Sequence, residues 1–270
     1  MKCQNSDCKN QSNWLRVHVL KQPGYFLESE WYCGESCLRE AVMQRLQRRK
    51  QPNREKQLQS LLRLKLGHIL LESGVISREQ LEKALEYQQE HPTLRLGSIV
   101  KILEYAAERE VTMALSRQFG LPVVKVNSQK ISETVLKMVP VEIVQSSHFV
   151  PLEFDTRENA LTLVTYDPAD LANMINLRSI LRCEVNIYLG DESMVLDLKD
   201  QFCRKAMESK RDEDSPPSDL GNDLPALANF IVERAKRLCA SSMSVRHFDQ
   251  FIWTRFDVER RSHDVVVQAA

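Results

Sequence analysis

Residues 65–88 read KLGHILLESGVISREQLEKALEYQ, and residues 95–118, thirty positions on, read RLGSIVKILEYAAEREVTMALSRQ. Six of the 24 aligned positions are identical: the Leu-Gly pair, the following Ile, an Ala-Leu pair and the closing Gln. A repeat of this period indicates a supersecondary unit that cannot bury its apolar face alone and packs against its copy. With two copies only, the pattern favours a module of paired helices over a solenoid.

The first copy has the pattern of a helix, a tight turn and a second helix. Apolar residues at helical spacing predict the first helix, namely Leu62, Leu66, Ile69 and Leu70. Gly74 stands where a left-handed helix stop is needed, and Ser77 with Gln80 forms a capping-box pattern. The second helix carries one stripe of residues on a single face, namely Leu81, Ala84, Leu85 and Gln88. Core packing explains the leucines, but not the basic residue before Leu-Gly or the closing Gln of both copies.

After residue 122 the pattern changes from helical to mixed. Strands are predicted at 122–126, 148–150, 160–164 and 185–188, with helices at 132–139 and 169–181 between them. This alternation indicates a small α/β sandwich in which helices cover a sheet.

Short motifs continue beyond the repeat in a fixed order: Phe119-Gly120-Leu121-Pro122, Val139-Pro140, Val150-Pro151-Leu152, Leu161-Thr162-Leu163 and Tyr166-Asp167-Pro168. Together with the repeat, they resemble the N-terminal, MshEN-type domain of type II secretion and type IV pilus assembly ATPases. The resemblance covers residues 60–200.

In part of that family this domain is a receptor for cyclic di-GMP, so the resemblance implies a binding module for that nucleotide and a partner in the secretion or pilus machinery. The chemistry is suitable: an Arg can bind guanine O6 and N7 with two hydrogen bonds, a Leu-Gly helix start lets backbone N–H groups approach phosphate, and Leu or Ile side chains form an apolar floor. The resemblance places this role on Lys65, Leu66, Gly67, Leu70, Gly74, Leu81, Leu85, Gln88, Arg95, Leu96, Gly97, Val100, Leu115, Gln118 and Asp167.

A second hypothesis is an interaction scaffold that has kept the fold and lost the nucleotide. Its support is the divergence of the second copy, where Glu104 stands opposite Gly74 and Ala106 opposite Ile76. A charged residue at the turn would also repel an anionic ligand.

Four of the seven cysteines crowd near the start of the chain, at Cys3, Cys8, Cys33 and Cys37. Two pairs separated by a loop suit a tetrahedral zinc site, and the run from Trp31 into a helix is similar to the second half of treble-clef zinc fingers. Residues 14–20 are expected to form a strand between the pairs, with His18 as a substitute ligand. Disulfides are the alternative, but nothing in the sequence indicates an oxidising compartment. The remaining cysteines are expected to be inert thiols.

Between the cysteines and the repeat lies a basic segment with Arg45, Arg48, Arg49, Lys50, Arg54 and Lys56. A zinc-finger regulator that binds nucleic acid is therefore a third hypothesis. Acidic residues dilute the run and no aromatic side chains are interleaved for base stacking, so an ordinary solvated linker helix is favoured.

The tail from Leu224 predicts a helix to Leu238, then strands that weakly resemble the segment preceding the motor of secretion ATPases. No glycine in the chain is followed by Lys, so the phosphate-binding loop Gly-x-x-x-x-Gly-Lys-Ser/Thr is absent. Motifs for hydrolases, metalloproteases and cyclic-dinucleotide turnover are also absent. The sequence therefore predicts a protein that is not an enzyme.

Composition bounds the rest of the interpretation. With 270 residues and 43% hydrophobic content, the chain can bury more than one core. A formal net charge of zero implies no global attraction to nucleic acid or membranes, and no apolar run is long enough for a membrane span, so a cytoplasmic protein is expected. The expected class is α+β, with a zinc-finger head (1–44), a basic helical linker (45–59), a helical repeat subdomain (60–122), a small α/β sandwich subdomain packed with it (123–205), a charged linker (206–223) and a degenerate remnant of the ATPase N-terminal region (224–270).

Overall fold

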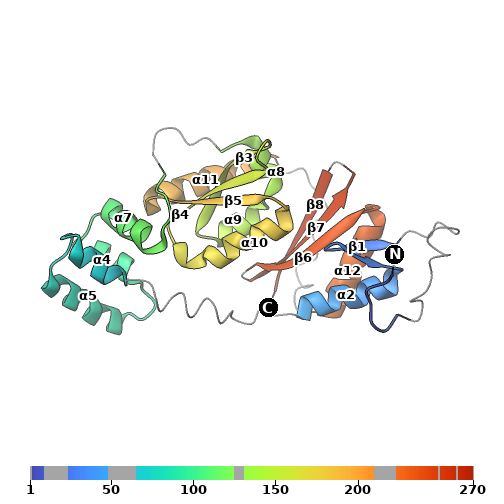
Figure 1. The fold of residues 1–270 in the computed structure, drawn as a ribbon, viewed down its shortest axis with the longest axis horizontal. Coiled ribbons are helices and arrows are strands. Elements are labelled where there is room, and N and C mark those ends of the chain that lie inside the picture. The colour runs from blue at the N-terminus through green and yellow to red at the C-terminus, as the bar shows by residue number, and fades with distance from the viewer. Residues whose placement is uncertain are drawn as a thin grey trace. The chain divides into compact units, whose positions relative to one another are not determined.

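The computed structural model describes residues 2–8, 24–47, 65–124, 131–209, 223–248, 250–259 and 261–269 (Figure 1). Helices and two separate sheets confirm the α+β class. The chain divides into two compact units: unit 1 combines Met1–Gln51 with Lys210–Ala270, and unit 2 is Pro52–Ser209. Each unit has its own sheet.

The repeat forms two helix-turn-helix copies in unit 2, as predicted. Copy one consists of α4 (Leu66–Glu72) and α5 (Arg78–Glu90), and copy two of α6 (Leu96–Ile102) and α7 (Glu108–Phe119). Ser77 and Gln80 form the expected capping box, in which each side chain accepts a hydrogen bond from the other residue's backbone N–H.

The two Leu-Gly pairs pack against each other reciprocally. A methyl group added at Gly67 would lie 2.8 Å from Leu81 Cδ1 and 3.2 Å from Leu96 Cδ2. One added at Gly97 would lie 3.3 Å from Leu66 Cδ2. Each glycine therefore leaves room for the leucine of the other copy, and packing accounts for the identity of the Leu-Gly pairs.

The turn differs between the copies in its residue but not in its backbone. Gly74 has φ 70° and Glu104 has φ 56°, so both residues adopt the left-handed conformation. Behind the turns, Ile76 and Ala106 are buried in one shared repeat core. The second copy therefore keeps the turn of the first, with a non-glycine residue in a conformation that favours glycine.

The second half of unit 2 is a three-stranded sheet of β3 (Phe149–Asp155), β4 (Ala160–Thr165) and β5 (Glu184–Leu189). Strand β4 lies in the centre, antiparallel to β3 and parallel to β5. The crossover from β4 to β5 runs through η1 (Pro168–Asp170) and α10 (Leu171–Leu181). These three strands and the helix between β4 and β5 were predicted from the sequence.

Helices flank this sheet: α8 (Glu133–Met138), α9 (Val141–Ser146) and α11 (Glu192–Ser209) pack on β3, and α10 packs on β5. The sequence did not predict α9 or α11. The predicted strand at 122–126 is only an isolated bridge between Val123 and Leu189 in its described part, and residues 125–130 lie outside the described ranges.

Unit 1 corrects the expected domain organisation. The head forms β1 (Tyr25–Leu27), β2 (Glu30–Tyr32) and α2 (Glu35–Gln47), and the tail forms α12 (Leu224–Arg237), β6 (Ser242–Phe248), β7 (Phe251–Val258) and β8 (Arg261–Gln268). These are not two separate segments, 1–44 and 224–270, because their strands make one sheet in the order β2-β1-β6-β7-β8.

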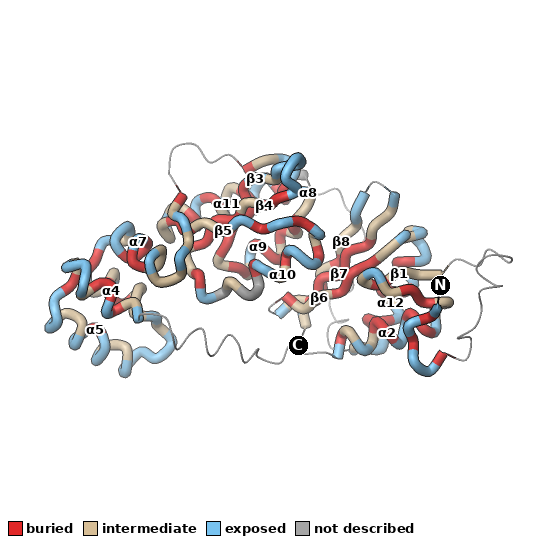
Figure 2. Tube along the Cα trace, in the orientation of Figure 1, coloured by how far each residue is buried: buried red, intermediate tan, exposed pale blue. Residues whose placement is uncertain are grey.

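The head joins the tail through β1 and β6, which are parallel and pair at Leu27 and Met243. The Glu28 N–H donates to the Met243 carbonyl at 2.9 Å. One apolar core contains buried side chains from α2, α12 and the sheet. Buried residues are red in Figure 2, for example along β7. The tail is thus part of the same folding unit as the head.

Several expectations lie outside the described residues: the strand at 14–20 with His18, most of the basic linker 45–59, and most of the charged linker 206–223, whose first residues, 206–209, belong to α11 instead. They stay predictions.

The turns of the repeat allow a matched stability test. Gly74→Ala is expected to lower the free energy of unfolding by about 1 kcal/mol, because an L residue is strained at this φ. Nothing lies within 4 Å of the added Cβ, so no clash contributes. Glu104→Gly is expected to leave stability unchanged or to raise it by up to about 1 kcal/mol, since relief of strain is offset by the entropy of glycine. Denaturant unfolding followed by circular dichroism measures both; a loss for Glu104→Gly larger than that for Gly74→Ala would contradict the assignment.

Candidate functional site

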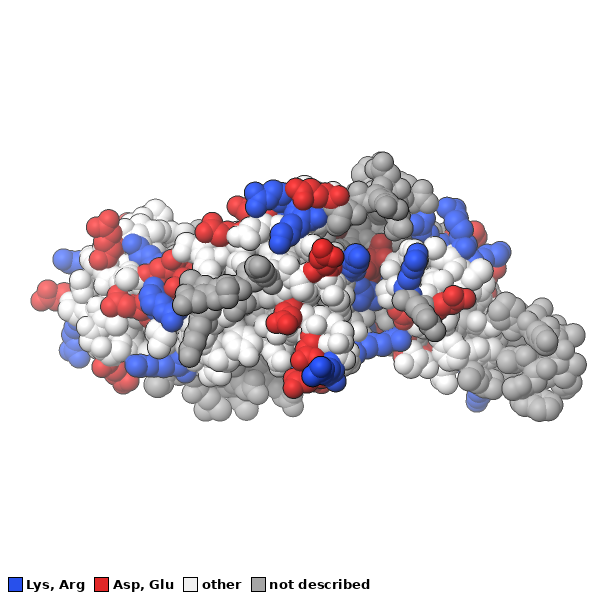
Figure 3. All heavy atoms as spheres, turned by 90° about the horizontal axis from the view of Figure 1, so that it is seen from above, with Lys and Arg blue, Asp and Glu red and all other residues white. Residues whose placement is uncertain are grey.

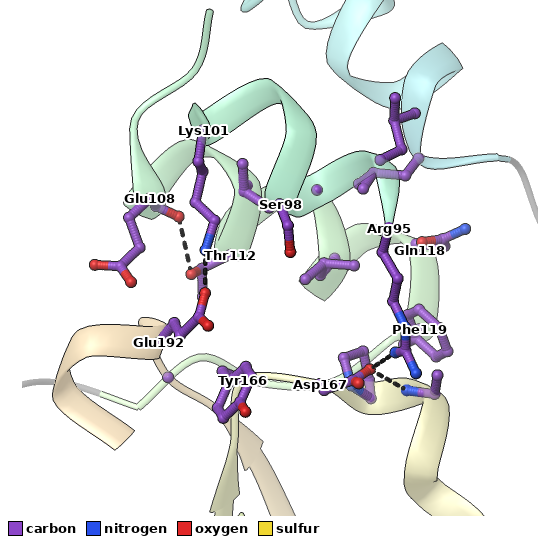
Figure 4. Close-up of a pocket in the computed structure, with 18 residues that line it drawn as sticks. Arg95, Ser98, Lys101, Glu108, Thr112, Gln118, Phe119, Tyr166, Asp167 and Glu192 are labelled. Atoms are coloured by element: carbon purple, nitrogen blue, oxygen red, sulfur yellow. Dashed lines mark hydrogen bonds and ion pairs between the residues drawn. The ribbon is translucent and has the colours of Figure 1, made fainter. Parts of the chain in front are cut away.

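A pocket of about 270 Å³ lies in unit 2, between copy two of the repeat and loops of the α/β subdomain (Figure 4). The repeat contributes Leu66, Arg95, Leu96, Gly97, Ser98, Lys101, Glu108, Val111, Thr112, Leu115, Gln118 and Phe119. The α/β subdomain contributes Tyr166, Asp167, Pro168, Ala169, Gly190 and Glu192. One wall is therefore apolar, and charged side chains lie at its two ends.

Arg95 and Asp167 form an ion pair at one end of the pocket. Arg95 is the N-cap of α6 and its side chain is 59% exposed, whereas the side chain of Asp167 is 13% exposed. The Asp167 carboxylate also accepts the Ala169 N–H at 3.1 Å and lies 3.9 Å from His148 Nδ1. The carboxylate is therefore held in place, while the guanidinium can exchange partners.

Lys101 and Glu192 form a second ion pair at the opposite end. Beside it, the Glu108 carboxylate accepts the Ser193 N–H at 2.8 Å and the Ser193 hydroxyl at 2.6 Å. Burial alone would raise the pKa of Glu108, but these hydrogen bonds outweigh it and hold the pKa below its ordinary value. Glu108 is thus a carboxylate at neutral pH.

Carboxylates outnumber cations around the pocket. Arg95 and Lys101 face Glu108, Asp167 and Glu192, which gives a formal charge of two minus three, or −1. Burial, followed by the negative charges of Glu192 and Asp167, raises the pKa of Tyr166, so its hydroxyl stays neutral. Such a site offers strong donors and strong acceptors, which suits a polar heterocycle more than a bare anion.

Seven of the residues that the resemblance predicts for nucleotide binding line this pocket: Leu66, Arg95, Leu96, Gly97, Leu115, Gln118 and Asp167. The others lie outside its lining. Leu70 and Val100 are fully buried in the repeat core, Gly67 and Leu81 pack together, and Gly74 forms its turn.

The three remaining predicted residues lie on or near the surface of copy one. Lys65 is the exposed N-cap of α4, in the position that Arg95 has in copy two. Leu85 is 42% exposed on α5. Gln88 Nε2 donates to the Leu94 carbonyl at 3.1 Å, which ties the end of α5 to the loop before α6. This bond gives the closing Gln of copy one a structural role.

Sequence reasoning missed the polar residues at the second end of the pocket: Ser98, Lys101, Glu108, Thr112, Tyr166 and Glu192. One signal was present in the sequence. Lys101 stands where copy one has Leu71, so a charged residue replaces an apolar one two positions after the conserved Ile of the repeat.

Unit 1 contains the four clustered cysteines, whose sulfur atoms all lie within 4.8 Å of one another. Cys33 Sγ lies 3.5 Å from Cys8 Sγ and 3.8 Å from Cys37 Sγ. Four thiolates around a tetrahedral Zn²⁺ with Zn–S of ~2.3 Å would lie ~3.8 Å apart. The cluster could therefore hold a metal ion.

The turn that carries the first pair is fixed by Asn5, whose side-chain oxygen accepts the Asp7 N–H at 2.9 Å and whose amide donates to Glu40 at 2.7 Å. Burial, followed by bonds with the neighbouring thiols, raises the pKa of Cys33. All four sulfurs can be thiolates at once only with a cation among them, since like charges at such distances repel.

Comparisons with known proteins agree with the resemblance predicted from the sequence. The family model of the MshEN domain matches residues 119–209. The type IV pilus assembly ATPase PilB of Myxococcus xanthus is 25% identical over 223 residues, covering 75% of this chain and 38% of the relative. The type IV pilus assembly ATPase PilB of Thermus thermophilus is 24% identical over 135 residues, covering 49% of this chain and 15% of the relative. The chain thus spans less than two fifths of the length of either curated relative.

Two solved structures are also similar. MshE with cdg is 25% identical with a TM-score of 0.45, covering 52% of this chain and 99% of that chain. The N-terminal domain of XpsE is 19% identical with a TM-score of 0.41, covering 57% of this chain and 98% of that chain. The resemblance to the N-terminal domains of pilus and secretion ATPases is confirmed for part of the chain.

Within the described residues, no helix combines the length and apolar character needed to cross a bilayer.

Proposed function

We propose that this chain is a non-catalytic receptor or adaptor that binds cyclic di-GMP in the pocket of unit 2 and serves a type IV pilus or type II secretion system. The observation that carries the proposal is the meeting of Arg95, at the start of copy two, with Asp167, at the end of β4, beside an apolar wall. The MshEN match and the similarity to pilus assembly ATPases support the association with such machinery.

The two charged groups complement a guanine. Its O6 and N7 are acceptors suited to the guanidinium of Arg95, and its N1–H and N2–H groups are donors suited to a carboxylate such as Asp167. In the structure these two side chains bind each other, so a guanine would replace one ion pair with two sets of charge-assisted hydrogen bonds.

The size of the pocket limits what it encloses. At about 270 Å³, it is smaller than the ~300–1,000 Å³ typical of sites that enclose a drug-sized molecule. We therefore assign it one guanine of the dinucleotide, with the other half lying over copy one near Lys65. The excess of carboxylates around the pocket disfavours enclosing a phosphate there.

Calorimetric titration of the full chain with cyclic di-GMP tests the proposal. Arg95→Ala is expected to weaken binding by about 1–3 kcal/mol, the scale of a lost bidentate guanine contact. Arg117→Ala is the matched control, because this arginine is exposed on the same subdomain and does not line the pocket. Lys65→Arg is expected to tighten binding, since a guanidinium fork replaces a point charge. Equal affinities of wild type and Arg95→Ala for cyclic di-GMP would contradict the proposal and leave the repeat with a packing role alone.

A ligand-free interaction scaffold is the second candidate function. The observations that favour it are the net negative lining of the pocket and the charged Glu104 at the turn of copy two. No heat and no thermal shift with cyclic di-GMP at high micromolar concentration would select this candidate.

Nucleic-acid binding is the remaining alternative. On the face shown in Figure 3, acidic and basic side chains of the described residues are interspersed, which does not favour a phosphate-tracking surface. Duplex binding that weakens steeply with salt would support this alternative.

The cysteine cluster is proposed to hold a structural zinc ion, with Cys3, Cys8, Cys33 and Cys37 as thiolate ligands. Its separations and burial suit a closed tetrahedral site, and cysteine sulfur is a preferred zinc ligand. The metal would supply a cross-link between the first residues and the β2–α2 region.

Metal analysis of freshly prepared reduced protein is expected to find about one zinc per chain. The double variant Cys33→Ser with Cys37→Ser is expected to lose the metal and to unfold unit 1, tail included, because small metal sites and their folds form together. All three tryptophans belong to unit 1, so tryptophan fluorescence reports its unfolding, and the helical signal of unit 2 should persist. Cys239→Ser, at an exposed position outside the cluster, is the control. Zinc-free protein with native fluorescence would refute the assignment.

The absence of a phosphate-binding loop predicts no ATP hydrolysis. Without its backbone cradle and lysine, the chain has no usual means to hold the β- and γ-phosphates with magnesium. Phosphate release from ATP should equal the protein-free background at every magnesium concentration. Activity that follows the chain through several chromatographic steps would contradict this prediction.

A further inference from the structure

Polar contacts between the repeat and the start of α11 come from copy two. Lys101 forms an ion pair with Glu192, and Glu108 accepts two hydrogen bonds from Ser193. A guanidinium nitrogen of Arg109 lies 3.6 Å from a carboxylate oxygen of Asp191. The three partners are consecutive residues at the start of α11. One short stretch of chain thus receives three side chains from α6 and α7.

The repeat itself shows that these contacts are special to copy two. Where copy two has Lys101, Glu108 and Arg109, copy one has Leu71, Arg78 and Glu79. The first position is apolar in copy one, and the charges at the other two are reversed. The helical fold of the repeat does not need the copy-two residues, because copy one forms the same fold without them.

The charges also suit the helix ends that they join. Lys101 lies in the last turn of α6, where a cation is favourable, and Glu192 in the first turn of α11, where an anion is favourable. Glu108 accepts a backbone N–H from the first turn of α11, where such groups have no partner within the helix. Figure 4 shows Lys101 pointing across the pocket end toward Glu192.

We propose that Lys101 and Glu108 are positioning residues, which hold copy two against the start of α11 and fix the width of the pocket before a ligand arrives. The Arg95–Asp167 pair is different in kind, because the guanidinium is mostly exposed and becomes the ligand's contact. Lys101 is the more buried of the two cations, with a side-chain exposure of 24% against 59% for Arg95, and its pair with Glu192 stays formed. The pocket thus has one exchangeable end and one fixed end.

Hydrogen exchange of the full chain without ligand tests this arrangement independently of the proposed function. Lys101→Glu places two carboxylates together and is expected to speed exchange in α6, α7 and the start of α11 by about five- to tenfold. Glu192→Lys should do the same. The double variant Lys101→Glu with Glu192→Lys restores opposite charges and should recover part of the protection from exchange. It should not recover all of it, because the anion then lies at the end of α6 and the cation at the start of α11, where each is unfavourable.

Two further variants separate a specific pair from general damage. Lys101→Arg keeps the charge and should keep protection, whereas Lys101→Leu copies the residue of copy one and should raise exchange less than Lys101→Glu does. Lys83→Glu, the same charge change at an exposed site on α5, is the control. Wild-type exchange in both single charge reversals, or a double variant no better than either, would overturn the proposal.

A second experiment, which measures cyclic di-GMP binding, rests on the proposed function. If the wild type binds cyclic di-GMP, Lys101→Leu should weaken binding several-fold although Arg95 and Asp167 are intact, since less of the pocket is preorganised. Unchanged affinity in Lys101→Leu would overturn the link between positioning and binding. If the wild type binds no cyclic di-GMP, the proposed function fails, and the exchange experiment alone decides on the positioning contacts.

Discussion

The reciprocal contact of two Leu-Gly helix starts is the constraint on which unit 2 depends. Leu66 lies over Gly97 and Leu96 near Gly67, so a side chain at either glycine would force the leucine of the other copy to shift. Neither pair of short helices could bury its apolar face alone, because isolated helices of seven residues are not stable in water. The repeat in the sequence is therefore first a packing requirement.

The same residues also define the pocket. Leu66, Leu96 and Gly97 serve the contact between the copies and line one wall, so packing holds the apolar floor rigid. Arg95 precedes this contact as the N-cap of α6, which fixes its backbone, and its side chain reaches Asp167 at one end of the pocket. The copies keep the Leu-Gly pairs identical and diverge in charge elsewhere, for example at Lys101 and Glu104. A repeat under this constraint can change its charges without changing its fold.

The sequence predicted what short-range signals determine. The helices of the repeat, their turns at Gly74 and the capping box at Ser77 follow from residues within one or two helical turns of each other. The pocket pair Arg95–Asp167 was reached only through the family resemblance, because its members are 72 residues apart. Lys101–Glu192, at a separation of 91, carries no local signal beyond the departure from Leu71. Pairing of β1 with β6 was missed for the same reason.

That missed pairing changes the physical meaning of the cysteines. A head of two three-residue strands and one helix has too little core for stability, which is why a metal staple was expected from the sequence. In the structure this head shares the core of the tail, where α12 and the central strands supply Leu227, Ile231 and Phe256. Cys3, Cys8 and Cys37 are buried in that same core. A metal ion held by the cluster would therefore cross-link a core that the tail completes. Loss of the metal and loss of the tail would then each lower the stability of the same cooperative unit.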